Sequence, residues 1–333
     1  MTAILVTGGA GYVGSHSCKA LAAAGFLPVS FDNLSTGHRW AVQWGPLEKG
    51  DLDDIDAVRQ ALRRHRIEAV MHFAASSNVG DSMRRPGFYY RNNVGGTLNL
   101  LEAMIDCGIK KLVLSSSCAT YGRPQNTPIP EGHPQSPMSP YGETKFAAER
   151  MLRWWDEVHG LRFVALRYFN AAGADAECRI GEAHDPETHL IPLAIATVLG
   201  QRPHLVIHGT DYPTADGTAV RDYVHVSDLA EAHLAALRHL LGGRHSLSCN
   251  LGTGRGHSVR QVIAAVERVA RRRLPVIEGP RRPGDPPELV AFAQLANQVL
   301  DWKPEITDLE RIVSTALRWH RGSILTAAQA AKL

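Results

Sequence analysis

The sequence lacks a run of apolar residues that is long enough to cross a membrane. Its longest apolar stretch, from Leu190 to Leu199, is broken by Pro192. This stretch falls well short of the ~20 residues that a membrane-spanning helix needs. The N-terminus carries no basic segment followed by a cleavable apolar segment, because Met1 leads directly into the strand-like run Ile4–Val6. We therefore expect no membrane partner and a cytoplasmic location.

Cysteine pairs and an excess of charge are also missing. The five cysteines form an odd set without a Cys-X-X-Cys pair, which argues against a disulfide framework. The 36 Lys and Arg residues nearly balance the 33 Asp and Glu residues, for a formal net charge of +3. Without a basic tail, this balance offers no electrostatic basis for binding nucleic acid. The 44% hydrophobic and 21% charged fractions are those of a globular chain, and 333 residues suit about two domains.

Strand-like runs alternate with helical patterns through the first half of the chain. Strands are predicted at Ala3–Thr7, Pro28–Phe31, Glu68–Phe73, Leu112–Ser115 and Phe163–Arg167. Helices are predicted at Gly14–Ala24, Asp53–His65, Asn92–Cys107 and Glu143–His159. This order predicts an α/β fold with a Rossmann-type, doubly wound parallel sheet that is covered on both faces.

Beyond Gly173 the composition of the chain changes, and loops rich in Gly, Pro, Asp and His are predicted. Shorter elements are predicted at Leu193–Leu199, Leu205–His208, Asp228–Leu241, Leu247–Leu251 and Val259–Ala270. They indicate a smaller C-terminal α/β lobe with site-forming loops. We predict a first domain over residues 1–170 and a substrate-binding lobe over residues 171–333. The segment at about 220–241 is expected to rejoin the first domain.

A glycine-rich turn follows the first predicted strand. Gly8, Gly11 and Gly14 have the spacing of a pyrophosphate-binding turn between a strand and a helix. A side chain there would block the approach of the backbone to the phosphates, and the helix N-terminus offers free N–H groups. Asp32 ends the second strand, where a carboxylate binds ribose hydroxyls and repels the 2′-phosphate of NADP. The turn and Asp32 therefore predict that the domain over residues 1–170 binds NAD. Asp51 fits the adenine side, although a helix cap would explain it equally well.

A tyrosine and a lysine stand four residues apart near the start of a predicted helix. Tyr141 and Lys145 share one face of that helix, so the ammonium is expected to lie near the phenol. An adjacent cation favours the ionised phenol, which would then act as a general base. Ser117 follows a predicted strand, and the carboxyl ends of parallel strands line the ligand crevice. We predict that Ser117, Tyr141 and Lys145 are catalytic.

This combination of residues resembles the extended short-chain dehydrogenases/reductases, and within them the epimerases that act at carbon 4 of UDP-glucose and UDP-galactose. The similarity extends over nearly the whole chain. It is carried by the blocks His72–Ala75, Asn92–Thr97, Arg167–Asn170, Asp211–Thr218, Val220–Val226 and Pro280–Asp285. Related dehydratases have an acidic pair directly after the catalytic Ser or Thr. This chain has Cys118 and Ala119 there, so it lacks the acid and base for eliminating water.

The resemblance implies an NAD-dependent interconversion of UDP-glucose and UDP-galactose. Tyr141 would take the proton from the 4-hydroxyl of the sugar during transient oxidation at carbon 4, and Ser117 would bind that oxygen. Lys145 would hold the nicotinamide ribose. The 4-keto sugar would then rotate and take back the hydride on its other face. The resemblance also implies a homodimer, formed through the helices Asn92–Cys107 and Glu143–His159.

Further site residues follow from the same resemblance. Those expected around the cofactor are Gly8, Gly11, Tyr12, Val13, Gly14, Asp32, Asn33, Ser35, Thr36, Gly37, Asp51, Leu52, Phe73, Ala74, Ala75, Asn93, Ser115, Tyr141, Lys145 and Tyr168. Those expected around the UDP-sugar are Ser117, Tyr141, Asn170, His189, Leu190, His208, Arg221, Tyr223, Arg282, Asp285 and Leu289. Arg221 and Arg282 would hold the diphosphate with their planar guanidinium groups, and Asp285 would face the uridine ribose.

The sequence does not decide which sugar the substrate carries. Leu289 stands where residue size separates plain hexoses from N-acetylated ones, and a leucine is intermediate. UDP-N-acetylhexosamines therefore remain alternative substrates, as do UDP-xylose and UDP-arabinose. Another extended short-chain sugar-nucleotide oxidoreductase would use the same scaffold, but it would consume or release NAD(H) stoichiometrically.

One group of residues invites a zinc interpretation. His184, Asp185, Glu187 and His189 lie close together in a loop. The loop has no helical or strand register that would make four ligands converge, and the implied reaction needs no metal. We therefore expect no metal site.

Overall fold

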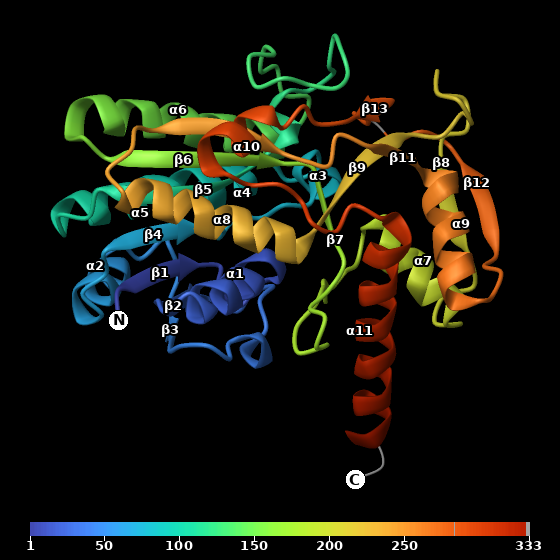
Figure 1. The fold of residues 1–333 in the computed structure, drawn as a ribbon, viewed down its shortest axis with the longest axis horizontal. Coiled ribbons are helices and arrows are strands. Elements are labelled where there is room, and N and C mark those ends of the chain that lie inside the picture. The colour runs from blue at the N-terminus through green and yellow to red at the C-terminus, as the bar shows by residue number, and fades with distance from the viewer. Residues whose placement is uncertain (283, 331–333) are drawn as a thin grey trace.

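The computed structural model describes residues 1–282 and 284–330 of the chain. Pro283, in the Pro280–Asp285 run, and residues 331–333, at the end of the predicted substrate lobe, lie outside the described residues. A large layered α/β body occupies most of the molecule, and a smaller lobe with α7, α9 and α11 lies at one end (Figure 1).

A seven-stranded sheet forms the centre of the large body (Figure 1). Its strands are, in spatial order, β10 (Leu247–Leu251), β6 (Arg162–Tyr168), β5 (Lys111–Ser117), β4 (Ala69–His72), β1 (Ala3–Thr7), β2 (Leu27–Asp32) and β3 (Leu47–Lys49). All neighbouring strands pair in parallel. The strand order reverses between β1 and β4, and ligands bind at such a switch point, beyond the carboxyl ends of the strands. The predicted fold class is confirmed.

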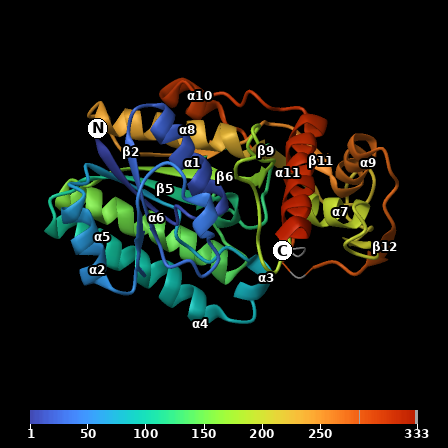
Figure 2. The same cartoon turned by 90° about the horizontal axis from the view of Figure 1, so that it is seen from below.

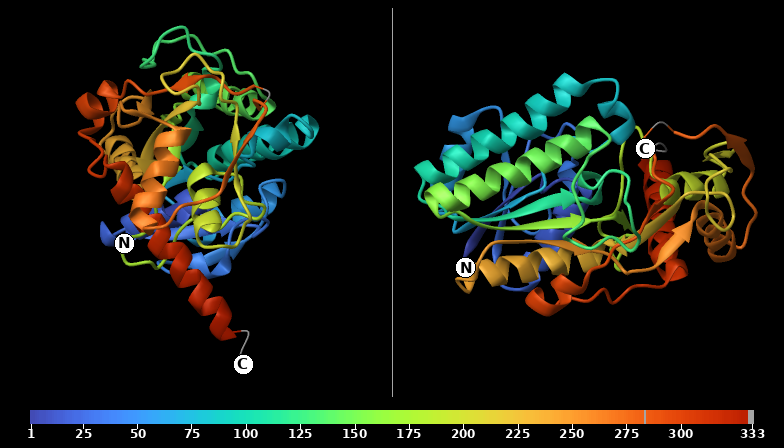
Figure 3. Two further views of the ribbon diagram at one scale, coloured as in Figure 1. Left: turned by 90° about the vertical axis from the view of Figure 1, so that its right-hand side faces the viewer. Right: turned by 90° about the horizontal axis from the view of Figure 1, so that it is seen from above.

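Helices cover both faces of this sheet. One face carries α1 (Tyr12–Ala23), α8 (Val226–Leu241) and α10 (Gln294–Leu300), and the other carries α2 (Ile55–Arg64), α5 (Gly96–Asp106) and α6 (Pro140–His159) (Figures 2 and 3). Alternate residues of β1 point to opposite faces of the sheet. Ile4 and Val6 pack toward α8, and Leu5 packs toward α5. Because this strand is buried on both faces, its sequence is continuously apolar instead of alternating, which explains the run at Ile4–Val6.

The chain leaves the sheet after β6 and returns to it much later. β9 (Val220–His225) leads into α8, which packs against α1. β10 then pairs with β6, from Leu247 opposite Val164 to Leu251 opposite Tyr168. The return to the sheet therefore continues to Leu251, beyond the expected segment at about 220–241. The division of the chain at residue 170 stays a prediction.

The smaller lobe is built on three helices and short strands. α7 (Leu190–Val198), α9 (Val259–Ala270) and α11 (Leu309–Ala330) share one apolar core. β8 (Leu205–His208) pairs with β12 (Val276–Gly279). β9 pairs with three further strands, which are β7 (Asn170–Ala172), β11 (Gly256–Ser258) and β13 (Glu288–Leu289). Sequence analysis missed most of these strands, together with α10 and α11, because they are short or lie in segments without regular alternation.

Helix boundaries differ from the predicted ones where a cap decides the start. α6 begins at Pro140, three residues early, because Ser139 accepts a hydrogen bond from the Gly142 N–H at 3.2 Å and proline suits the first turn. α2 begins at Ile55 because Asp54 caps it. The helix predicted from Asn92 opens with a π-helical turn at Tyr90–Gly95 before α5.

The remaining helical turns are short. They are α3 (Val79–Ser82), α4 (Pro86–Tyr89) and two 3₁₀ turns at Arg39–Ala41 and Cys118–Thr120. Among the helices that the structure describes, none combines the length and the apolar character that crossing a membrane would require.

Acid is expected to unfold the protein through its buried histidines. Burial lowers the pKa of His16, His225 and His233 to about 4 and that of His72 to about 3. Below about pH 6.5 the unfolded chain therefore binds protons that the folded chain does not, and stability falls until about pH 4. We expect the free energy of unfolding to drop by at least about 3 kcal/mol in denaturant titrations from about pH 7 to pH 4.5.

One of these histidines supplies the control. His233 is fully buried, and its Nε2 has no hydrogen-bond partner within residues 1–282 and 284–330. A His233→Leu variant should lose part of the pH dependence. An unchanged pH dependence in this variant would show that other groups cause the acid unfolding.

Candidate active site

The glycine-rich turn links β1 to α1 in a space that admits no side chain. A Cβ on Gly8 would lie 2.7 Å from the Ala74 nitrogen, and one on Gly14 would lie 2.2 Å from the Gly8 carbonyl oxygen. Gly8 also has a φ of +73° and donates its N–H to the Phe31 carbonyl at 2.9 Å. Gly11 is the N-cap of α1 and brings no capping side chain, and the first turn has no acidic residue. The exposed N–H groups and the positive helix end therefore fit a dinucleotide pyrophosphate.

A Gly14→Ala substitution is expected to reduce the amount of bound NAD at least about tenfold, because the added methyl group must displace the turn. Gly14 has ordinary helical geometry, so the variant tests space and not backbone strain. NAD released from the denatured protein can be measured by absorbance. Gly95→Ala is the matched control, since a Cβ on Gly95 meets nothing within 4 Å. Equal NAD in both variants would contradict the assignment of the turn.

Asp32 is fixed at the end of β2 by two backbone N–H groups. Its carboxylate accepts hydrogen bonds from Ala10 N at 3.0 Å and from Leu34 N at 2.8 Å. Burial raises the pKa of Asp32, and the two hydrogen bonds oppose this rise. A Cβ on Gly37 would lie 2.9 Å from Asp32 Oδ1, so the segment after β2 folds back on the carboxylate.

The residues expected on the adenine side lie next to Asp32. Asn33 donates its side-chain N–H to Asp51 at 2.7 Å and accepts from the Ser35 backbone N–H at 2.9 Å. Ser35 and Thr36 are exposed. Since Asp54 caps α2, the interpretation of Asp51 as the helix cap is wrong.

The ends of β4 and α5 complete this side of the crevice. Ala74 donates its backbone N–H to the Thr7 carbonyl at 3.1 Å, which places the segment Phe73–Ala75 beside the glycine turn. The Asn93 side chain accepts from Ser76 N at 2.8 Å and donates to Thr144 Oγ1 at 3.0 Å. Asn93 thus joins the loop after β4 to α6. Leu52 is buried against Gly96 at the start of α5.

Ser117, Tyr141 and Lys145 come together where β5 meets the start of α6. Each is less than a tenth exposed, and Ser117 lies close enough to Tyr141 to lower the pKa of its phenol. Lys145 donates its ammonium to the Ser115 carbonyl oxygen at 2.7 Å. The Ser115 hydroxyl lies 2.8 Å from Tyr168 Oη, so a second tyrosine borders the group.

The pKa of Tyr141 depends mainly on burial. Burial raises the pKa of its phenol well above the ordinary value, and the hydrogen bond from Ser117 lowers it only in part. Lys145 is held at the Ser115 carbonyl, and burial lowers its own pKa to about 8, against the effect of Glu149. Burial therefore dominates the pKa of Tyr141 in the protein by itself, and the expected effect of Lys145 on the phenol stays a prediction.

A buried ion pair that sequence analysis missed lies beneath these residues. Arg167 on β6 and Glu149 on α6 are 3% and 0% exposed, and the guanidinium donates to both carboxylate oxygens, at 2.6–3.2 Å. Ser116 Oγ also donates to Glu149, at 2.5 Å. Glu149 follows Lys145 by four residues on the same helix, and this spacing is the signal that could have revealed it.

The candidate substrate side lies across the crevice on β9, β13 and β7. Arg221 on β9 pairs with Asp285 at 3.5 Å and stands opposite Leu289 of β13. Leu289 is buried in one cluster with Cys118, the residue after Ser117. Asn170 on β7 is half-buried and pairs with Tyr223 in the ladder. The structure thus brings Arg221, Asp285 and Leu289 to the Ser117 side of the crevice.

Other expected substrate residues lie farther into the lobe. His208 ends β8, and burial lowers its pKa, with a smaller effect from the charge of Arg282. Arg282 is exposed. The neighbouring Arg281 stacks on Tyr212, with its guanidinium carbon 4.4 Å from the ring centroid. Tyr223 is buried in the core of the lobe, and this burial raises its pKa to about 12.

The loop before α7 corrects another expectation. Glu182, His184, Glu187 and His189 each bring a potential ligand atom into one group, within 4.8 Å of one another. The reasoning that this loop has no register for convergence is therefore wrong. The participating acid that sequence analysis missed is Glu182, and Asp185 does not take part. His189 is the N-cap of α7, next to Leu190.

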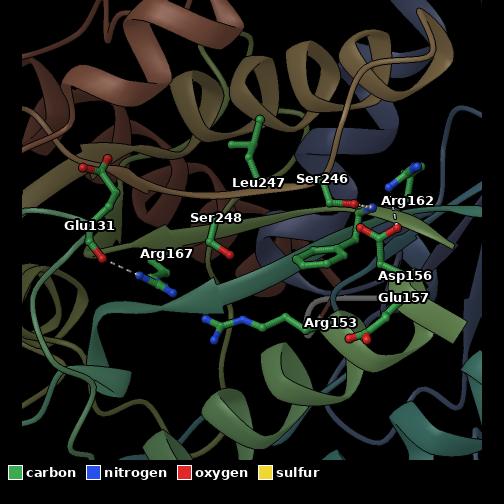
Figure 4. A pocket seen from close by; sticks show the side chains of 10 residues that line it. Glu131, Arg153, Asp156, Glu157, Arg162, Arg167, Ser246, Leu247 and Ser248 are labelled. Atoms are coloured by element: carbon green, nitrogen blue, oxygen red, sulfur yellow. Dashed lines mark hydrogen bonds and ion pairs between the residues drawn. The ribbon is translucent and has the colours of Figure 1, made fainter. Parts of the chain in front are cut away.

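A large hollow in the described residues lies away from this site. It measures about 690 Å³ and opens beside α6 and β10 (Figure 4). None of the expected site residues lines it. Two of its arginines are engaged with neighbours: Arg162 pairs with Asp156 at 2.7 Å, and Arg167 donates to the Glu131 carbonyl (Figure 4). A smaller hollow is lined by Gly11, Tyr12, Thr36 and His184, at the glycine turn.

The geometry and a family comparison lead to the same class of protein. A model of the NAD dependent epimerase/dehydratase family matches residues 4–252, and the chain belongs to this family. The predicted family and its cofactor, NAD, are thereby confirmed.

Individual relatives cover nearly the whole chain. The chain is 52% identical over 317 residues to a UDP-glucose 4-epimerase of Rhizobium meliloti (strain 1021), covering 95% of this chain and 96% of the relative. The UDP-glucose 4-epimerase of Brucella ovis in complex with NAD has a TM-score of 0.93 at 48% identity, with 96% and 98% of the two chains covered. The UDP-glucose 4-epimerase of Bifidobacterium longum in complex with NAD⁺ and UDP has a TM-score of 0.92 at 34% identity, with the same coverage.

Proposed function

We propose that this protein interconverts UDP-glucose and UDP-galactose by inverting carbon 4 of the sugar. The observation that carries the proposal is the buried group of Ser117, Tyr141 and Lys145 at the carboxyl ends of the strands, beside a turn built for a dinucleotide. Relatives with the activity named UDP-glucose 4-epimerase cover nearly the whole chain at about half identity, which supports the same reaction.

The residues around the turn would hold the cofactor. Gly8, Gly11 and Gly14 with the N-terminus of α1 would bind the pyrophosphate, and Asp32 would bind the adenosine ribose. NAD, when bound, supplies the hydride acceptor for carbon 4 and the donor that restores it. Lys145 would hold the nicotinamide ribose, from its place at the Ser115 carbonyl.

The protein moves the proton. Tyr141 Oη would accept the proton of the 4-hydroxyl and return it to the same oxygen after the 4-keto sugar has rotated. Ser117 lies close enough to lower the pKa of this phenol, so the serine would position the same oxygen. Because burial alone raises the pKa of Tyr141, the phenolate needs positive charge, which Lys145 and the oxidised nicotinamide ring would supply.

The residues on the substrate side of the crevice would hold the nucleotide and leave the sugar free to rotate. Arg221 and Arg282 would bind the diphosphate, and Asp285 would face the uridine ribose. Leu289, packed beside Cys118, would limit the size of the sugar substituents. The remaining contacts to the UDP-sugar are assigned to Asn170, His189, Leu190, His208 and Tyr223. Firm binding of the nucleotide with loose binding of the sugar is what rotation of the 4-keto sugar requires.

The test is to incubate the purified protein with UDP-galactose without added cofactor and to identify the product. We expect UDP-glucose, with no net NADH formed. Parallel reactions with UDP-xylose and UDP-N-acetylgalactosamine establish which sugars fit beside Leu289. Stoichiometric formation of NADH would identify a net oxidoreductase, and failure to convert all three substrates would overturn the proposal.

We also propose that the protein forms a homodimer through α5 and α6. Trp154 and Val158 on the outer face of α6 are 59% and 67% exposed, which leaves large apolar groups on a helix surface. Association of α5 and α6 from two copies would cover them. A mass equal to one chain in light scattering at micromolar concentration would contradict this proposal.

A further inference from the structure

Four potential metal ligands converge in the segment between β7 and α7. His189 Nδ1 lies 2.8 Å from Glu182 Oε1 and 2.9 Å from Glu187 Oε1. His184 Nδ1 lies 3.1 Å from Glu182 Oε1 and 3.7 Å from Glu187 Oε2. Two imidazole nitrogens and two carboxylates thus face one point from within eight residues of sequence.

The spacing of these atoms suits a four-coordinate ion. Zinc binds histidine nitrogen and carboxylate oxygen at about 2.0–2.2 Å, so neighbouring ligand atoms of a tetrahedral site lie about 3.4 Å apart. The four nitrogen–oxygen distances lie on both sides of that value, and shifts of less than about 1 Å would bring them to it. Two carboxylates and two neutral imidazoles carry a total charge of −2, which one divalent cation neutralises.

Within residues 1–282 and 284–330, no lysine or arginine pairs with these two carboxylates. In the part of the chain that the structure describes, the ion pairs of Glu182 and Glu187 involve only His184 and His189. The Glu182 side chain is 5% exposed, and that of His189 is 47% exposed. The group is therefore anchored inside the protein and open to solvent at one ligand, which gives an ion a path of entry.

The backbone around the group is held from several sides. Trp319 on α11 donates its indole N–H to the Glu182 carbonyl at 2.9 Å, and Gly181 packs directly against the indole ring. His38 Nε2 lies 2.6 Å from the Ala183 carbonyl oxygen. The backbone of His189 is held at the N-cap of α7, where its carbonyl accepts from the Leu193 N–H at 3.1 Å. Such anchoring presents the ligands in nearly constant positions, which favours a metal site over a loose polar loop.

We propose that Glu182, His184, Glu187 and His189 bind one divalent transition-metal ion, of the zinc class. The ion would have a structural role, because all four positions come from the protein. His184 packs edge-on against Tyr12 of the cofactor turn, with ring centroids 6.2 Å apart. The metal would therefore join the start of α7 to the loop that lies over this turn. The site is separate from Ser117, Tyr141 and Lys145, and it shares His189 with the residues assigned above to the UDP-sugar.

Direct measurement of bound metal tests the site. The full-length protein is treated with a chelator, dialysed against micromolar zinc and then against buffer, and its metal content is determined by mass spectrometry. We expect one equivalent of zinc per chain and a higher unfolding temperature, since a ligand of the native state alone stabilises it. Cobalt(II) in place of zinc should give the intense visible bands of a tetrahedral site. A wild-type protein without stoichiometric zinc would overturn the proposal.

Variants locate the ion. His184→Ala and Glu187→Gln each remove one ligand, and the second keeps the size and hydrogen-bonding capacity of the side chain, so it guards against a simple folding defect. We expect at least about a tenfold loss of zinc affinity in each variant. His245→Ala removes an exposed histidine elsewhere and should retain full binding. Equal zinc content in wild type and Glu187→Gln would show adventitious binding. Since metal content is read without turnover, a failure here is distinct from a failure of the epimerase assay.

Discussion

Replacement of Tyr141 by phenylalanine is expected to reduce turnover of UDP-galactose about a thousandfold, because general acid–base groups typically contribute factors of this size. The substitution removes only the phenol hydroxyl, and Tyr141 is 8% exposed. The packing of α6 and the binding of NAD should therefore survive. Product formation and NAD released on denaturation are measured on the same preparation.

Tyr89→Phe is the control for loss of a buried tyrosine hydroxyl. Tyr89 is 1% exposed, and its hydroxyl donates to the Asn78 carbonyl at 2.7 Å. Its removal should cost about 1 kcal/mol of stability and leave turnover close to that of wild type. Retention of more than a tenth of the activity by Tyr141→Phe would mean that another group takes the proton. Loss of NAD by the same variant would mean that the hydroxyl holds the cofactor instead.

The second large effect is on stability. Arg167→Met is expected to lower the free energy of unfolding by about 3–5 kcal/mol, because it leaves the Glu149 carboxylate buried without its partner. The guanidinium also donates to Tyr121 Oη at 2.9 Å and to Gln135 Oε1 at 3.2 Å, and these bonds disappear with it. Chemical denaturation of the wild type and the variant at pH 7 provides the measurement.

Two further variants separate burial from charge. Arg260 and Glu278 form a pair at 2.7 Å whose side chains are 45% and 58% exposed, so Arg260→Met should cost less than about 1 kcal/mol. The double variant Arg167→Met/Glu149→Leu removes both buried charges and should recover most of the loss. If Arg167→Met and Arg260→Met cost the same, the buried pair contributes no more than a surface one.

The sequence predicted the part of the fold that depends on local patterns. Strands such as Ala3–Thr7 and helices such as Val259–Ala270 have the predicted bounds, because strong apolar runs and caps determine them. Small strands such as β13 (Glu288–Leu289) were missed, since a two-residue strand has no periodicity and exists only because β9 lies beside it. Tertiary pairing, which no local pattern contains, forms such elements.

The candidate site also has a part that the sequence predicted and a part that it did not. Ser117, Tyr141 and Lys145 were predicted to act together, and the structure brings them together, because strand ends and helical spacing follow from the sequence. The burial that raises the pKa of Tyr141 was not predicted, since the depth of burial depends on residues distant in sequence. Glu182 was missed for the same reason: only the folded loop brings its carboxylate to His184 and His189.

The late return of α8 and β10 to the sheet also determines when the molecule can be completed during its synthesis on the ribosome. Until Leu251 has emerged, β6 is an edge strand with unpaired N–H and C=O groups, and the apolar face around Ile4 and Val6 lacks the leucines of α8. A nascent chain that ends near residue 170 is therefore exposed to edge-to-edge association. The cofactor-binding sheet closes only after β7, α7, β8 and β9 have been made, so its maturation follows theirs.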